Sequence, residues 1–178
     1  MKTKFFTLTL LAMLAAVTMN AQSLNGTWKA GEELTQLLGS EDESNPVKAM
    51  FITIDGNKMD WCFQGEMSDE TLGDVVFQIV FPSTFQRDGN KISDMKMQKD
   101  KAAFKVVKCG AGDAMAKLLE NVLNEQLKKS DNNAFEGIEE MASALAEGTL
   151  IIETLTDTKL KMYAEDDEDK QVLSFDRQ

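Results

Sequence analysis

The feature that most constrains the fold is a strict alternation of apolar and polar side chains at 58–68. Its bulky apolar positions are Met59, Trp61, Phe63 and Met67. A period of two places successive side chains on opposite faces of a β-strand, so we expect a strand with one buried face. A second apolar segment precedes this run across Asp55-Gly56-Asn57, a turn sequence that is typical of a β-hairpin.

Turn sequences recur along the chain and separate further short strands. Asp88-Gly89-Asn90-Lys91 repeats the tetrapeptide at 55–58. In both, glycine accepts a positive φ and asparagine tolerates one, so the repeat indicates reused turn chemistry. Such spacing is typical of an antiparallel meander, in which neighbours in sequence pair in space.

About eight or nine strands are expected in total. The strand at 72–81 carries Phe77 and Ile79 on its apolar face, and Pro82 is expected to end it. The remaining expected strands are 24–30, 47–55, a run that ends at Met97, 102–108, 149–155, 159–164 and 172–175.

One segment, 112–147, changes from a period of two to helical spacing. Apolar residues follow that spacing from Asp113, a plausible N-cap, to Lys129. Asp131-Asn132-Asn133 breaks the pattern, and a second helix is expected at 134–147. We therefore predict a helical hairpin inserted late in a chain that is otherwise mainly β.

A meander of eight or more short strands has two exposed edges unless it closes. Closure gives an antiparallel up-and-down barrel, which at about eight strands is filled by side chains or holds one small ligand. We predict one such domain at 22–178. The alternative is an open sheet packed under the helix pair.

The first 21 residues have the layout of a secretory signal peptide. Lys2 and Lys4 form a positive end, an apolar run follows, and cleavage is expected between Ala21 and Gln22. The run is shorter than the ~20 residues of a membrane-spanning helix, which argues against a retained anchor. We expect export to the periplasm or beyond, with no membrane insertion after the signal is removed.

Charge and composition exclude several classes of function. The chain has a formal net charge of −11, and removing the two lysines of the signal makes it more acidic, so nucleic acid is not an expected partner. It contains no histidine, which excludes His-based triads and imidazole metal sites. Two acidic clusters at 41–43 and 165–169 lack the spacing of a calcium loop. No metal site or cofactor is expected.

The two cysteines, Cys62 and Cys109, leave two alternatives open. An even pair in an exported chain permits one disulfide. Two buried free thiols are the other alternative.

At the start of the first strand, Asn25-Gly26-Thr27-Trp28 resembles the Gly-x-Trp signature of lipocalins and lipocalin-like bacterial domains. Late in the chain, 155–160 resembles the penultimate hairpin of small exported lipocalin-like proteins of Bacteroidota. The resemblance implies a barrel with one end closed by Trp28. Arg177 is the candidate for the arginine that packs on this tryptophan in the family. The helical hairpin departs from the family pattern, because lipocalins carry their helix after the last barrel strands.

If the barrel closes, its interior candidates are Trp28, Met59, Trp61, Phe63, Met67, Phe77 and Ile79. Methionine is flexible and polarizable, so this lining suits a small hydrophobic ligand. The same side chains could instead fill the interior, as they do in small barrels. We expect a monomeric, non-catalytic binding protein, and the alternative is an interaction or structural module of the cell envelope with a filled core.

An enzyme is not expected. Ser93-Asp94-Met95-Lys96 and Ser130-Asp131-Asn132 fit two motifs of serine β-lactamases and penicillin-binding proteins. Ser-x-x-Lys needs a helix to bring its two ends together, and here it lies in a segment expected to be a strand.

Overall fold

The computed structural model describes residues 23–32, 34, 47–128, 140, 142–144 and 147–178. The expected signal peptide and the acidic cluster at 41–43 lie outside this part. So do Ser130-Asp131-Asn132 and most of the expected second helix, although 142–144 are helical. None of the described helices is long and apolar enough to span a membrane.

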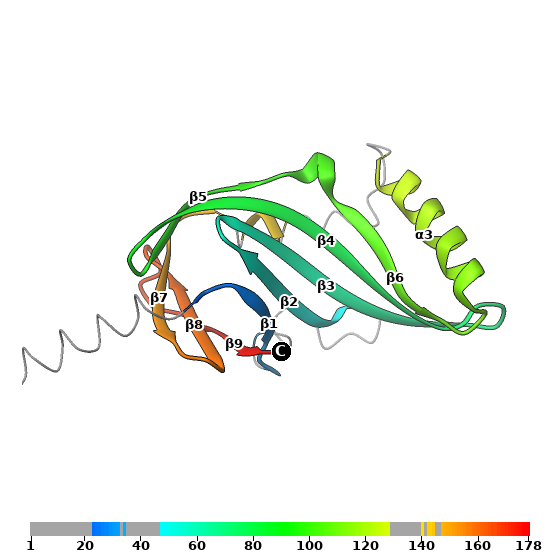
Figure 1. Ribbon diagram of the computed structural model, residues 1–178, viewed down its shortest axis with the longest axis horizontal. Helices are drawn as coiled ribbons and strands as arrows, with labels where there is room; N and C mark the ends of the chain where they lie inside the picture. Colours follow the sequence, from blue (N-terminus) through cyan, green and yellow to red (C-terminus); the bar gives the residue numbers. More distant parts are fainter. Residues whose placement is uncertain (1–22, 33, 35–46, 129–139, 141, 145–146) are drawn as a thin grey trace, which may run out of the picture.

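The elements that the structure describes in full are nine strands, the α-helix α3 and one short 3₁₀ helix (Figure 1). They are β1 (Gly26–Ala30), β2 (Val47–Asp55), β3 (Lys58–Asp69), β4 (Gly73–Asp88), β5 (Lys91–Met97), η1 (Lys99–Lys101), β6 (Ala103–Cys109), α3 (Asp113–Leu127), β7 (Leu150–Leu155), β8 (Lys159–Ala164) and β9 (Leu173–Arg177).

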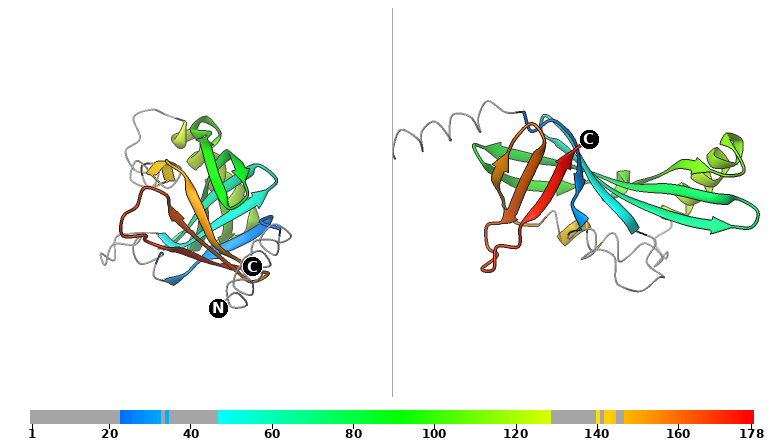
Figure 2. Two further views of the ribbon diagram at one scale, coloured as in Figure 1. Left: turned by 90° about the vertical axis from the view of Figure 1, so that its left-hand side faces the viewer. Right: turned by 90° about the horizontal axis from the view of Figure 1, so that it is seen from below.

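Eight of these strands close into an antiparallel barrel, which confirms the predicted fold class. The ring runs β1–β2–β3–β4–β5–β7–β8–β9 and returns to β1 through the pairing of β1 with β9. Figure 2 shows the ring nearly end on in its left view. Four pairs of neighbours in the ring, β2–β3, β3–β4, β4–β5 and β7–β8, are joined by tight turns, two of which are the repeated Asp-Gly-Asn sequences. Gly56 and Gly89 have φ of 61° and 60°, as such turns require.

The ninth strand, β6, lies outside the ring. It pairs with the first half of β4, while β5 pairs with the second half. The two strands therefore occupy consecutive stretches of the same edge of β4. β3 and β4 are long enough to continue past the barrel, and with β6 they form a three-stranded arm (Figures 1 and 2). This arm was not predicted from the sequence.

The prediction that Pro82 ends its strand is wrong, because β4 runs from Gly73 to Asp88. The carbonyl of Pro82 accepts a hydrogen bond from the backbone N–H of Gln98 (2.8 Å). A strand residue directs its carbonyl and its amide nitrogen to the same side, so the nitrogen of Pro82 faces the break between β5 and β6. Proline is tolerated in strands at positions where no ladder hydrogen bond is required.

Helix α3 covers the free edge of β6. The side chain of Asn124 accepts a hydrogen bond from the Phe104 amide (2.8 Å) and donates one to the Phe104 carbonyl (2.9 Å). A carboxylate oxygen of Glu120 accepts a hydrogen bond from the Val106 amide (2.9 Å). Side chains thus replace a neighbouring strand, which protects the edge from pairing with another chain. The helix is capped by Gly112 (φ 93°), and Asp113 is its first residue.

Replacing Asn124 with alanine should lower the free energy of unfolding by about 1–3 kcal/mol, because the backbone groups of Phe104 lose their partners. Asn121 lies exposed on the same helix and is the matched control. Both variants gain the same helix propensity, about half a kcal/mol, so Asn121→Ala should be neutral or slightly stabilising. Urea unfolding measures both, and equal stability of the two variants would contradict the edge-covering role.

Candidate functional site

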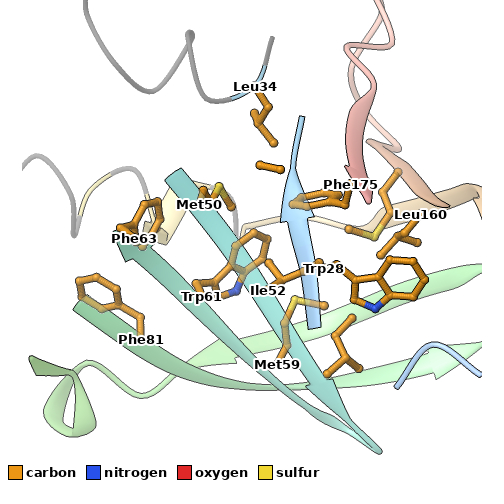
Figure 3. Packing of buried hydrophobic residues seen from close by; sticks show 14 of the residues in the cluster. Trp28, Leu34, Met50, Ile52, Met59, Trp61, Phe63, Phe81, Leu160 and Phe175 are labelled. Atoms are coloured by element: carbon orange, nitrogen blue, oxygen red, sulfur yellow. The ribbon is translucent and has the colours of Figure 1, made fainter. Parts of the chain in front are cut away.

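The interior of the barrel is the candidate site, and alternate positions of its strands supply it. On β3, Met59, Trp61 and Phe63 point inward, and the register pairs Trp61 with Ile52 of β2 and with Phe81 of β4. The interior residues form one apolar cluster (Figure 3). Its largest fully buried side chains are Trp28, Trp61, Phe63, Phe81, Phe175, Met50, Ile52, Ile54, Met59, Ile79, Ile92 and Ile152.

One end of the barrel is built around Trp28, whose side chain is 0% exposed. Its indole N–H donates a hydrogen bond to the carbonyl of Leu24 (2.9 Å), and the Arg177 guanidinium lies 4.7 Å from the ring centroid. The same guanidinium donates hydrogen bonds to the carbonyls of Ser23 (3.3 Å) and Asn25. The arginine contact expected from the resemblance is therefore present, and it fastens the segment before β1 across this end.

Trp61 lies in the middle of the cluster (Figure 3). It is also 0% exposed, and its indole Nε1 has no hydrogen-bond partner. Among the described residues, this is the one buried side-chain nitrogen or oxygen that lacks a partner. The hydroxyl of Ser83, also buried, donates to the Met59 carbonyl (2.5 Å). The N–H of Trp61 is thus the free hydrogen-bond donor of an otherwise apolar interior.

Five of the seven interior candidates are almost completely buried, and Phe77 is slightly more exposed. Trp28, Met59, Trp61 and Ile79 are 0% exposed, Phe63 is 1% and Phe77 is 9% exposed. Phe77 and Ile79 lie on the part of β4 that pairs with β6, and the Phe77 ring centroid is 6.0 Å from that of Phe104.

The prediction that Met67 lies in the interior is wrong, since its side chain is 46% exposed. The alternation of β3 keeps its phase, but β2 pairs with β3 only as far as Gly65, so the last four residues of β3 belong to the arm. There Met67 lines a surface hollow of about 270 Å³, together with Glu66, Ser68, Asp74, Val75, Val76 and Lys108.

Several interior residues were not singled out from the sequence. β2 contributes Met50, Ile52 and Ile54, but its apolar residues are nearly continuous and mark no single face. Leu160 and Met162 of β8 alternate with lysines, so the period of two was present in the sequence, but only over a strand of six residues. Phe175 of β9 is the one large aromatic residue of its strand and is 0% exposed.

The disulfide alternative is wrong, because Cys62 and Cys109 are both free. Cys62 pairs with Val80 on one side of β4, and Cys109 pairs with Val75 on the other. Val75 and Val80 are five residues apart along β4, which corresponds to about 16 Å. A disulfide needs the Cα atoms of its two cysteines within about 7 Å. Burial raises the pKa of the Cys62 thiol to about 11, with a smaller rise from Asp60 and an opposing pull from Lys105.

Both thiols should therefore react with an alkylating agent in denaturant without reductant, giving two adducts by mass spectrometry. In the folded protein at pH 8.5, Cys62 stays protonated and shielded, so we expect Cys109 to react first. Stability should fall as the pH rises from about 9 to about 11, because the unfolded thiol of Cys62 releases its proton before the folded one does. A chain that takes up no adduct in denaturant would contradict the free thiols.

The described residues contain no group of three or more histidine, cysteine, aspartate or glutamate side chains placed to hold a metal ion. A second surface hollow of about 360 Å³ lies beside β9. Its lining consists of Gly31, Glu32, Leu34, Lys159, Val172, Ser174 and Asp176, and contains none of the predicted interior residues.

The chain was compared with family models, curated proteins and solved structures, and none of them matches it.

Proposed function

We propose that this protein is an exported, non-catalytic, lipocalin-like barrel that binds one small hydrophobic ligand in its interior. The observation that carries the proposal is the buried N–H of Trp61, which has no partner in an apolar enclosure. Burying a donor without an acceptor costs about 1–3 kcal/mol, and native proteins contain few such groups. A ligand that brings an acceptor would recover this cost.

The methionines of the lining support the same proposal. Met50 and Met59 are 0% exposed and are near neighbours of Trp61 in the register of β2 and β3. Both side chains are completely buried against the rest of the cluster, so a ligand enters by displacing them. Methionine has three flexible torsions and repacks with little loss, which makes it the residue best suited to such displacement.

The lipocalin-like assignment and the export route are parts of this proposal. Support for the first comes from the closed eight-stranded ring and from Arg177 packed on Trp28. The second depends on the signal-like sequence at 1–21, with Bacteroidota as the source that the resemblance implies. We also propose a monomer without nucleic-acid partners, and the acidic balance supports this because it opposes contact with phosphates and with a second acidic copy.

A second candidate function is an interaction module of the cell envelope with a filled barrel core. The complete burial of the interior favours it, and so does the arm. Four large apolar side chains of the arm and its helix are exposed: Met67 (46%), Val107 (52%), Leu118 (56%) and Val122 (47%). Exposed apolar groups on a projecting element are typical of protein contact sites.

Native mass spectrometry of protein purified from its own host separates the two candidates. A small molecule retained at one per chain supports the ligand proposal and gives the ligand's mass. A bare chain that also leaves an apolar fluorescent probe unbound would overturn it. A discrete oligomer or a co-purified protein in size-exclusion chromatography would support the interaction module.

A further inference from the structure

The chemistry of the barrel interior restricts the class of ligand that it would hold. Ser83 is the one buried polar or charged residue of the described part, and its hydroxyl already donates a hydrogen bond to the Met59 carbonyl. The indole N–H of Trp28 is bonded to Leu24. Among the described residues, Trp61 therefore offers the one uncommitted side-chain N–H donor, and the Ser83 oxygen, whose proton is already donated, keeps lone pairs that can accept.

No buried side chain of the described part carries a charge. A carboxylate placed beside Trp61 would lack a counter-charge, and burying an unpaired ion is far more costly than burying a neutral carbonyl. A ligand with its own N–H or O–H donor would find only the Ser83 hydroxyl as an acceptor among the buried polar side chains, and away from Ser83 that donor would stay unpaired at the same penalty as the N–H of Trp61. A neutral carbonyl compound avoids both costs.

We propose that the Trp61 N–H donates a hydrogen bond to the carbonyl oxygen of a neutral, otherwise apolar ligand such as a fatty ester or a long-chain ketone. This inference rests on the proposed function, because it names the ligand class of the same site. Ile52 and Phe81, which flank Trp61 in the register, contact the hydrocarbon part, and Met59 moves to admit it.

The test compares three probes on the full-length chain: methyl laurate, an alkane of matching length, and sodium laurate. By calorimetry, the wild type should bind the ester about tenfold more tightly than the alkane, since a hydrogen bond to an otherwise unpaired buried donor is worth about that factor. It should bind the carboxylate most weakly. Trp61→Phe should bind the alkane as before and lose the preference for the ester. Asn121→Ala, at an exposed position of α3 outside the barrel, is the control and should keep the preference.

The ester carbonyl stretch supplies a readout that needs no variant. Its infrared band should move to lower frequency in the wild-type complex, as it does when a carbonyl accepts a hydrogen bond. Equal affinity for ester and alkane with no band shift would overturn this inference and leave the proposed function standing. Tightest binding of the carboxylate would also overturn it. Failure of the wild type to bind any of the three probes would overturn the proposed function as well.

Discussion

Trp28→Ala should lower the free energy of unfolding by about 3–5 kcal/mol, a large fraction of the 5–15 kcal/mol that stabilises an ordinary domain. The substitution leaves a cavity where a side chain was 0% exposed, and it removes the hydrogen bond from the indole to the Leu24 carbonyl. It also removes the ring against which the Arg177 guanidinium packs. Denaturant titration measures the loss, and a change below about 1 kcal/mol would show that this end of the barrel does not depend on the tryptophan.

The two tryptophans provide a matched comparison for the hydrogen bond itself. Trp28→Phe and Trp61→Phe remove the same atoms from side chains that are equally buried, but only the first breaks a hydrogen bond. Trp28→Phe should therefore be the more destabilising of the two by about 1 kcal/mol. A double-mutant cycle with Arg177→Leu measures the coupling free energy between Trp28 and Arg177. A cation–π contact of this kind contributes about 0.5–2 kcal/mol.

The barrel was largely predictable because its strands obey local rules. Alternation on β3 placed Met59, Trp61 and Phe63 on the buried face, and the Asp-Gly-Asn turns placed the hairpins. Those signals depend on a residue and its near neighbours, so one sequence contains them. Closure followed from the argument that exposed strand edges are unfavourable, which holds for any meander of this length.

The arm was not predictable because its limits are set by partners far away in sequence. Met67 keeps the phase of β3, yet its exposure depends on where β2 stops pairing. Pro82 is tolerated because two other strands separate beside it. The disulfide alternative failed for the same reason, since only the register on both sides of β4 shows that Cys62 and Cys109 lie far apart.

The unpaired N–H of Trp61 also lay beyond sequence reasoning. An inward tryptophan on β3 was expected, but whether its indole finds an acceptor depends on which atoms face it from other strands. Trp28 meets the carbonyl of Leu24, only four residues away, whereas Trp61 meets side chains of β2 and β4 that carry no acceptor. The candidate site is therefore defined by long-range packing, while the fold around it is defined by local pattern.

The barrel should open first at the seam between β5 and β7, and Ile92→Ala should reveal it. This seam has two residue pairs, Lys91 with Ile151 and Ile92 with Leu150, which is the shortest pairing in the ring. One further hydrogen bond, from the Ile152 amide to the Asn90 carbonyl (2.7 Å), extends it. Ile92 is 0% exposed, so its truncation should cost about 2–5 kcal/mol and loosen the seam locally.

Ile54→Ala is the matched control, because Ile54 is 2% exposed and lies on β2, which pairs with β3 over eight residue pairs. Both truncations should lower global stability by similar amounts, but only Ile92→Ala should accelerate hydrogen exchange selectively at the Ile152 amide. Exchange at low denaturant separates local from global opening, since locally opened amides keep exchanging when the barrel as a whole stays folded. Equal acceleration at Ile152 in both variants would mean that the ring opens as one unit, and a ligand would then have no preferred entry through the wall of the barrel.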